Sequence, residues 1–298
     1  LMATTPATPP VLEVPAQRHR IPLGYWLLLP GGLWLALFFI VPLYSLVATS
    51  LYDPGGGAIA GYEMTWSVTN YWHAIGDYTG PLGRSLLYGG IATVLCLLLG
   101  YPLAYSMAFK AGKWRNLMLV MVIAPFFTSF LIRTLAWKLI LADQGIVVQT
   151  LQTLHLLAPG GHLLATPVSV VAGLTYNFIP LMVLPLYAAL EKIDGSLIEA
   201  AQDLYASPLR GFLKVTLPLS MPGVVAGTLL TFIPAVGDYI NTQLLGNTET
   251  RMLGNVIESL FITVGDYPAA AALSMVLMLL IVGMVMLYVR KSGTEELL

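Results

Sequence analysis

Few residues of this chain could carry chemistry, and none of them falls into a catalytic or metal-binding pattern. The histidines lack the spacing of metal ligands; they are His19, His73, His155 and His162. A phosphate-binding loop is also missing, because Gly112-Lys113 is followed by Trp114 instead of Ser or Thr. The sequence therefore predicts no catalytic residues and no metal or cofactor on this chain.

Charged residues inside apolar segments are the remaining candidates, since burying a charge in hydrocarbon is costly. Arg133 and Lys138 lie in the outer part of an apolar run, where snorkelling towards the interface would explain both. Five residues apart, they point about 140° away from each other on a helix and cannot share one face.

A second group of polar residues follows a later apolar run. Asp238 comes directly after Gly237, where it could either meet a cationic solute or cap the next short helix. Tyr239 and Asn241 add hydrogen-bonding groups, and Glu258 adds negative charge further along the chain. Together with Arg133, these residues are our candidates for a substrate pathway or outer gate.

Long apolar runs are the elements that must position these residues. Of the 298 residues, 57% are hydrophobic and only 10% are charged, whereas charged residues make up about 25% of soluble domains. The sequence thus predicts an all-α integral membrane protein with six transmembrane helices. The expected spans are 23–47, 85–109, 116–141, 167–190, 219–236 and 269–289.

Prolines, glycines and short amphipathic patterns refine this picture. Pro30 and Pro42 predict kinks in the first span, while Pro180 and Pro185 predict breaks in the fourth. Residues 145–157 and 252–261 have the spacing of short half-buried helices. Small residues of the second span predict close helix packing; they are Gly89, Gly90, Ala92 and Gly100.

Domain organisation and orientation follow from the polar residues. We expect a disordered tail over 1–20, one transmembrane domain over 21–291 and a second tail over 292–298. Basic residues gather on the side of both termini and of the loop between spans four and five, which the positive-inside rule places in the cytoplasm. A net charge of −1 gives no argument for nucleic acid, and the single Cys96 allows no intrachain disulfide.

The longest polar, helix-forming interval lies between spans four and five, at residues 198–223. Its first part is rich in helix formers, and Ser207-Pro208 has the pattern of a cap and the first residue of a second helix. Two short helices with a bend are therefore expected on a membrane surface. Such a pair can be a mere connection, or it can dock a partner.

This interval resembles the EAA loop of binding-protein-dependent ABC importer permeases. The family pattern is Glu-Ala-Ala, three residues, Gly, nine residues, an aliphatic residue, one residue and Leu-Pro. Glu199, Ala200 and Ala201 match its first part, and Val215, Leu217 and Pro218 match its last part. The resemblance implies that this loop is a coupling helix seated on a separate ATPase, with Asp203 and Tyr205 inside the same surface.

Tyr205 departs from the family pattern, because it stands where the family has Gly. Glycine tolerates a positive φ at a bend, which a bulky residue adopts only at a cost of about 1 kcal/mol or more. Either the bend has ordinary angles here, or packing against the partner holds Tyr205.

Further segments resemble the first permease subunit of spermidine/putrescine-type ABC importers. They are 131–134 (Leu-Ile-Arg-Thr), 185–187 (Pro-Leu-Tyr), 237–241 (Gly-Asp-Tyr-Ile-Asn), 244–246 (Leu-Leu-Gly) and 253–257 (Leu-Gly-Asn-Val-Ile). The resemblance implies a bacterial inner-membrane importer with a second permease subunit, an ATPase dimer carrying ATP and Mg, and an extracytoplasmic solute-binding protein. The chain would then be no enzyme by itself.

Several alternatives stay open. Within the importer class, a polyamine is the first choice of solute; an amino-acid derivative, an opine or a phosphonate is the runner-up. A secondary transporter without an ATPase would explain the spans but not the matched loop. A membrane-embedded enzyme would need clustered histidines or carboxylates, which the sequence lacks. Pairing with a copy of itself, in place of a second permease, is also open.

Overall fold

The computed structural model describes residues 23–57 and 61–291, so the predicted tails 1–20 and 292–298 lie outside the described residues. Within those ranges the chain is helical, and the only β-type pairings are isolated bridges, Tyr52 with Met64 and Gly57 with Gly61. The described residues divide into two units, one up to residue 45 and one from residue 46 on, which we describe separately.

The first unit contains most of the first apolar run. Helix α1 (Leu23–Leu35) continues through a π-helical turn (Ala36–Ile40) into α2 (Val41–Ser50), and residues 28–50 form one helix long enough to span a membrane. Pro42 has no N–H to complete the regular bond pattern, and the wider π-turn that ends two residues before it, at Ile40, accommodates this loss. The first span therefore contains a local π-turn shortly before Pro42.

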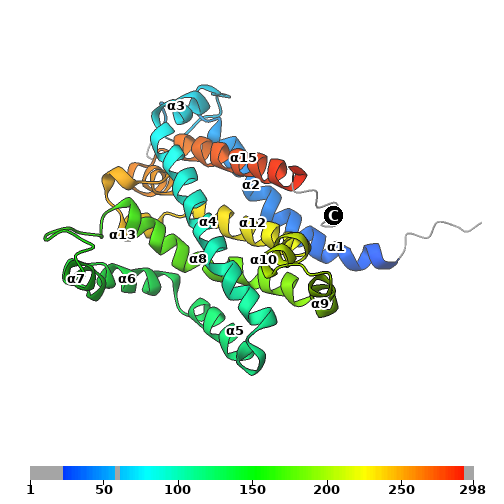
Figure 1. Ribbon diagram of the computed structural model, residues 1–298. Coiled ribbons are helices and arrows are strands. Elements are labelled where there is room, and N and C mark those ends of the chain that lie inside the picture. The colour runs from blue at the N-terminus through cyan, green and yellow to red at the C-terminus, as the bar shows by residue number, and fades with distance from the viewer. Residues whose placement is uncertain (1–22, 58–60, 292–298) are drawn as a thin grey trace, which may run out of the picture. The chain divides into compact units, whose positions relative to one another are not determined.

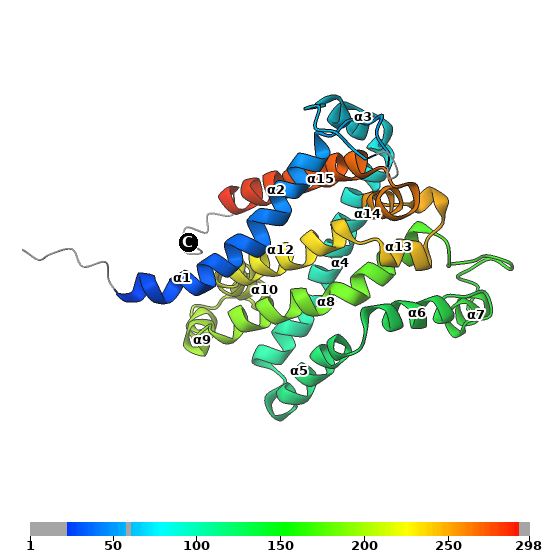
Figure 2. The same cartoon turned by 180° about the vertical axis from the view of Figure 1, so that it is seen from behind.

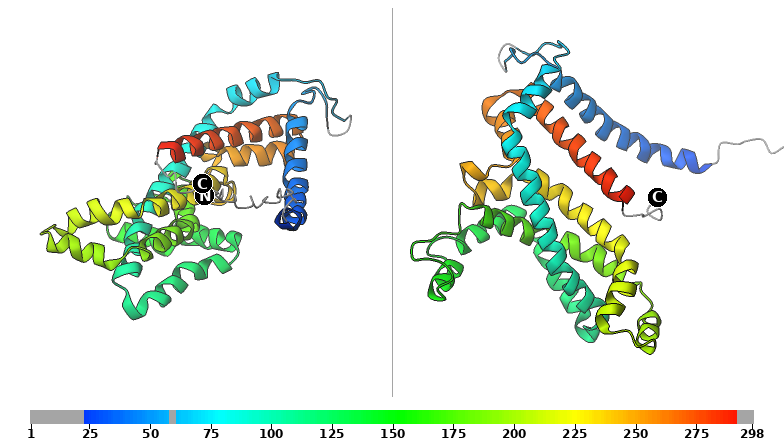
Figure 3. Two further views of the ribbon diagram at one scale, coloured as in Figure 1. Left: turned by 90° about the vertical axis from the view of Figure 1, so that its right-hand side faces the viewer. Right: turned by 45° about the horizontal axis from the view of Figure 1, so that its top comes forward.

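Three long helices form the centre of the second unit. They are α4 (Thr79–Phe109), α8 (Pro167–Glu191) and α12 (Met221–Gly237), and Figure 1 shows α4 crossing the other two. One apolar cluster joins Cys96 and Met107 of α4 to Met182 and Leu186 of α8. Helix α15 (Tyr267–Lys291) packs against α3 (Thr69–Asp77) beside this centre (Figure 3).

Small residues let these helices approach closely, as the sequence predicts, although not every glycine takes part. A Cβ on Gly89 would lie 2.6 Å from Val236 Cγ2 of α12, and one on Gly100 would lie 3.1 Å from Val183 of α8. A Cβ on Gly90 would instead meet no described atom within 4 Å. Only one residue of the Gly89-Gly90 pair therefore serves close packing.

The prolines of the fourth span do not break it. Helix α8 runs without interruption from Pro167 to Glu191 through both Pro180 and Pro185, so the predicted breaks are wrong. Helix α12 packs directly on this region: a Cβ on Gly223 would lie 2.8 Å from the carbonyl oxygen of Pro185. Neighbouring helices of this kind are what allow prolines inside a membrane helix.

The third apolar run, by contrast, is sharply broken. A 3-10 turn (Gly112–Trp114), α5 (Arg115–Ile123) and a second 3-10 turn (Ala124–Phe127) form its first half, and α6 (Phe130–Ile140) forms its second half. The two halves meet at 97°. Pro125 lies in the 3-10 turn and Thr128 is extended, so the prediction of one continuous span is wrong at this point.

Short helices gather at the two ends of α8 (Figure 2). Near its N-terminal end lie α7 (Ile146–Thr153), α13 (Ile240–Leu245), a 3-10 turn (Thr248–Thr250), α14 (Leu253–Glu258) and a π-helix (Ser259–Val264). After its C-terminal end come α9 (Gly195–Asp203), α10 (Pro208–Gly211), a π-helix (Phe212–Thr216) and α11 (Leu217–Leu219). Both predicted short helices, 145–157 and 252–261, are present.

The number of spans depends on how the bent helices are counted. Four described helices are long and apolar enough to cross a membrane. Six are reached if each bent pair is one span, because residues 208–219 and 221–237 also meet at an angle, of 65°. The chain is thus a multi-pass, all-helical membrane protein.

Candidate functional site

The loop after α8 consists of two helical arms, and its first arm is α9. The Ser196 N–H donates to Asp194 Oδ1 at 3.0 Å and so begins the helix; bonds from the Ser196 backbone and side chain hold the pKa of Asp194 below its ordinary value. Glu199, Ala200 and Asp203 are exposed. This arm therefore presents two acids and a small residue to its surroundings.

Tyr205 ends the first arm in the left-handed conformation, with φ of 57°. The Ala206 N–H donates to the Ala201 carbonyl at 3.1 Å, which is the six-residue bond of a Schellman cap. The Tyr205 side chain is 97% exposed, so nothing within the described chain holds it. The bend thus has the positive φ that glycine would adopt more easily.

The second arm is anchored in the core. Ser207 caps α10 by accepting from the Arg210 N–H at 3.4 Å, as predicted from Ser207-Pro208. The Phe212 ring packs edge-on against Tyr101, whose hydroxyl lies 2.7 Å from Ser220 Oγ. Leu217 packs on the same cluster, whereas Pro218 is exposed. The arms therefore differ: the second is fixed to α4, whereas the first, which we call the free arm, packs on the second arm.

A buried polar junction lies where α6, α8 and α13 meet. Asn177 of α8 donates through Nδ2 to Thr134 Oγ1 of α6 at 3.1 Å and to Asn241 Oδ1 of α13 at 3.0 Å. All three side chains are at most 1% exposed. Sequence reasoning missed Asn177 and Thr134, although an amide inside the apolar run 167–190 is a signal that could have found the junction.

Asp238 extends this junction and caps α13. Its Oδ1 accepts from the backbone N–H of Asn241 at 2.8 Å and from Asn241 Nδ2 at 3.2 Å. The capping alternative is therefore correct for Oδ1. Nothing in the described ranges donates a hydrogen bond to Oδ2, which stays available to another group.

Arg133 and Lys138 have different environments. Lys138 is exposed on α6, and its snorkelling towards the interface stays a prediction. Arg133 is only 8% exposed, so snorkelling is wrong for this residue. Its guanidinium lies 5.8 Å and 5.7 Å from the ring centres of Phe126 and Phe130. The opposite directions of the two side chains on one helix agree with their five-residue separation.

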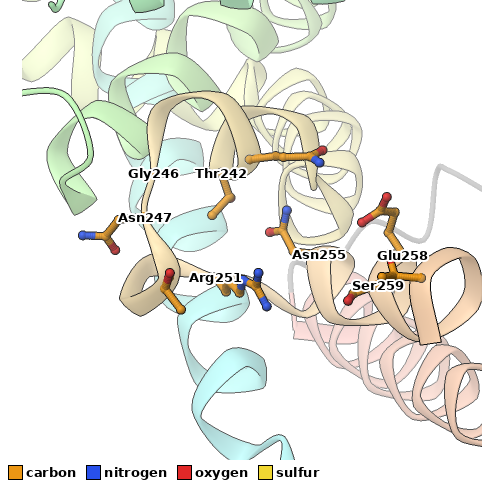
Figure 4. A pocket seen from close by; sticks show the side chains of 10 residues that line it. Thr242, Gly246, Asn247, Arg251, Asn255, Glu258 and Ser259 are labelled. Atoms are coloured by element: carbon orange, nitrogen blue, oxygen red, sulfur yellow. The ribbon is translucent and has the colours of Figure 1, made fainter.

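A polar cavity of about 420 Å³ lies beside the junction, between α13 and α14. Figure 4 shows its lining side chains, with Arg251, Asn255 and Glu258 on one stretch of chain and Thr242 opposite. Oγ1 of Thr242 is buried and has no hydrogen-bond partner among the described residues. Ten residues line the cavity: Thr242, Gln243, Gly246, Asn247, Thr248, Arg251, Asn255, Glu258, Ser259 and Thr263.

The candidate gate residues are therefore only partly brought together. Asp238 and Asn241 share one network, and the Tyr239 carbonyl joins the region by accepting from Asn255 Nδ2 at 2.7 Å. Glu258 belongs to the neighbouring cavity instead. Within 23–57 and 61–291 no group of three or more histidines, cysteines and carboxylates could hold a metal. Polar recognition of a solute, a partner or another chain segment is what this arrangement can do.

Comparison with known proteins places these features in a family. Residues 97–291 match the family of binding-protein-dependent transport system inner membrane components. The chain is 37% identical to the spermidine/putrescine transport system permease protein PotB of Haemophilus influenzae, over 87% of this chain and 90% of that protein. Identity to PotB of Escherichia coli is 36%, over 87% and 94% of the two chains.

The fold has a counterpart among solved structures. A crystal structure of a bacterial ABC transporter involved in import of the acidic polysaccharide alginate matches with a TM-score of 0.69. The match covers 91% of this chain and 94% of that one at 18% identity, which shows the shared fold. The chain belongs to the family of binding-protein-dependent transport system inner membrane components, the permease subunits of ABC importers.

Proposed function

We propose that this chain is the transmembrane permease subunit of an ATP-driven importer for a polyamine, spermidine or putrescine. The observation that carries this proposal is the 36–37% identity to spermidine/putrescine permeases over 87% of the chain. Such a chain forms half of a translocation pathway and hydrolyses no ATP itself. It works with a second permease subunit, an ATPase dimer carrying ATP and Mg, and an extracytoplasmic solute-binding protein.

The α9–α11 loop is the surface that we assign to the ATPase. Its free arm exposes Glu199, and three large apolar side chains stand out nearby: Leu204 is 82% exposed, Tyr205 97% and Leu209 67%. Exposed apolar side chains grouped with charge are typical of a protein–protein contact. The anchored arm, fixed through Phe212 and Ser220, would carry a movement of the ATPase into α4 and α12.

Orientation follows from this assignment and from the distribution of basic residues. The α9–α11 loop and both termini lie in the cytoplasm, which puts α13, α14 and the polar cavity towards the outside. Loaded binding protein would dock on that outer side. Arg115 and Glu191, an ion pair on the loop side of the molecule, link α5 to α8 there.

The outer region offers acids to a cationic solute. Glu258 lines the polar cavity. In Asp238, one carboxylate oxygen accepts no hydrogen bond from the described residues. Ammonium groups bind such oxygens together with hydroxyl and amide oxygens, which the cavity also provides. In this proposal Asp238, Tyr239, Asn241 and Glu258 line the pathway or the outer gate.

One observation favours a second candidate solute. Arg251 lines the same cavity as Glu258, so the cavity carries one charge of each sign. A solute with both an ammonium and a carboxylate group, such as an amino-acid derivative or an opine, fits that pair. An ATP-independent transporter is the weaker alternative, because it leaves the exposed loop without a role.

Uptake by proteoliposomes that contain the complete complex tests the proposal. We expect ATP-dependent accumulation of labelled spermidine when loaded binding protein is added. Glu199→Lys reverses the charge of the free arm, and we expect roughly a tenfold or greater loss of both uptake and co-purified ATPase. Glu63→Lys is the matched control for ATPase capture, because Glu63 is also exposed but lies outside this loop; it should retain the co-purified ATPase.

The possible failures separate the parts of the proposal. Uptake of an amino-acid derivative in place of spermidine would refute the polyamine assignment and keep the importer. Full ATPase capture and uptake by the Glu199→Lys variant would contradict the assignment of this helix to coupling. Uptake by wild type in liposomes that lack ATP would favour the secondary transporter.

A further inference from the structure

Arg133 is a buried cation that has no counter-charge in the described part of the chain. Its side chain is 8% exposed, and Nε and Nη1 have no hydrogen-bond partner there. Its guanidinium lies over two aromatic rings, those of Phe126 and Phe130. A cation–π contact is weak compared with the desolvation of a guanidinium, so an anionic partner is missing.

The position of Arg133 on its helix strengthens this argument. It lies in the first turns of α6, directly after the 97° break. The N-cap residue Ser129 makes no side-chain bond to the helix, and no acid lies in the first turn. The N-terminus of a helix is itself positive. Two positive features therefore coincide where no carboxylate of the described residues forms a salt bridge with Arg133.

The buried junction and the neighbouring Asp238 contain acceptor oxygens of the kind that the Arg133 guanidinium lacks. Thr134, the residue after Arg133, accepts from Asn177 Nδ2 at 3.1 Å. The other amide atom, Asn177 Oδ1, is a buried acceptor to which no described residue donates. Asp238, on the far side of Asn241, uses only Oδ1 for capping and leaves Oδ2 without a hydrogen bond from that part of the chain. Two acceptor oxygens without a donor from the described residues thus lie at this junction, and Arg133 directly precedes Thr134, the junction residue on α6.

Both charged residues lie next to a place where the chain can turn. Arg133 follows the break between the two halves of the third span. Asp238 follows Gly237, which ends α12 and has nothing described within 4 Å of where a Cβ would stand. Helices α6 and α13 contact each other in this structure. Helix breaks and residues free of contacts are the places where a rotation between them would be absorbed.

We propose that Arg133 is the internal counter-ion of Asp238, and that the two form an ion pair beside Asn177 in another state of the transport cycle. This inference rests on the proposed function: the pair sets a tethered cation against the carboxylate that an ammonium group of the solute would reach. Arg133 and the solute then compete for Asp238. Arg133 therefore determines which cations can replace it at Asp238, and this replacement determines when the pathway opens.

A double-mutant cycle on spermidine uptake by the complete reconstituted complex tests the pair. The variants are Arg133→Gln, Asp238→Asn and the two combined. We expect each single variant to lose about tenfold or more, and the double variant to lose no more than the worse single one. Losses that multiply in the double variant, or a single Arg133→Gln variant with full uptake, would overturn the pair.

Lys138→Gln is the matched control, because Lys138 is a cation of the same helix that is exposed. It should leave uptake unchanged, and combined with Asp238→Asn it should behave as Asp238→Asn alone. Coupling of Lys138 to Asp238 as large as that of Arg133 would show that any positive charge on α6 suffices, against the proposal.

A second measurement needs neither transport nor a particular solute. Spin labels at Leu135→Cys and Gln243→Cys, both exposed, report the distance between α6 and α13 in the complete complex, without nucleotide and with trapped ATP. We expect two distances, the shorter of which lengthens in Arg133→Gln. One unchanged distance in every state overturns the pair, whatever solute the importer carries. The distance measurement also gives a result for variants that assemble but do not transport.

Discussion

Tyr205 shows at the scale of a single residue how this chain departs from its family pattern without losing the bend. The backbone adopts a φ of 57°, the region that glycine favours, and a single Schellman-type bond from Ala206 to Ala201 supports it. The exposed ring makes no contact within the described chain that would compensate the strain. A residue kept in a strained conformation with an exposed side chain is typical of a surface that meets a partner.

We expect Tyr205→Gly to stabilise the loop by about 1 kcal/mol, because glycine removes the left-handed penalty. The loop should then open about fivefold less often, and trypsin should cleave after the exposed Arg210 correspondingly more slowly. Tyr205→Ala is the control at the same position, since it removes the ring and keeps the penalty. An equal gain in both variants would contradict the argument from strain.

At the scale of the helices, glycines decide where two helices can pack closely. Gly89 and Gly90 are neighbours on α4, yet only Gly89 faces α12, where Val236 backbone atoms would lie 3.1–3.2 Å from its Cβ. Backbone atoms cannot move aside as the end of a flexible side chain can. A methyl group should therefore have opposite effects at the two positions.

We predict that Gly89→Ala destabilises the permease by about 1–3 kcal/mol, the usual cost of overpacking. Gly90→Ala should instead stabilise it by up to about 1 kcal/mol, because alanine is the better helix former and meets nothing in the described chain. Thermal unfolding of the purified complex in detergent gives both signs in one experiment. Equal effects at the two positions would mean that α4 and α12 do not pack as described.

At the scale of the whole molecule, the main feature is the orientation of the chain in the membrane. Basic residues predict that the α9–α11 loop faces the cytoplasm. Cys96 is fully buried, so the parent chain gives no background in labelling with thiol reagents. New cysteines on either side of the membrane can therefore be distinguished.

Ser196→Cys in α9 and Thr248→Cys next to α13 are both exposed positions. A membrane-impermeant thiol reagent should label the cysteine introduced at position 196 only in inside-out vesicles and the one at position 248 only in right-side-out vesicles. Labelling of both positions from the same side would refute the orientation. Labelling in the reversed pattern would place the coupling loop outside the cell and exclude its proposed role.

The sequence by itself determined the class of this protein and most of its helices. Apolar length decides what can span a membrane, and local residue chemistry decides a cap such as Ser207-Pro208. These effects act within a few residues of chain, so a linear reading predicts them. The family pattern around Glu199 is local in the same sense and led to the family that the comparisons show.

Tertiary structure alone decided what depends on neighbours distant in sequence. Packing of α12 on α8 accompanies an unbroken helix through Pro180 and Pro185, where propensity alone predicted breaks. Asn177 meets Thr134 and Asn241 across 43 and 64 residues of chain. The burial of Arg133 likewise comes from the fold around the α5–α6 break, because the same cation on a straight span would have reached water.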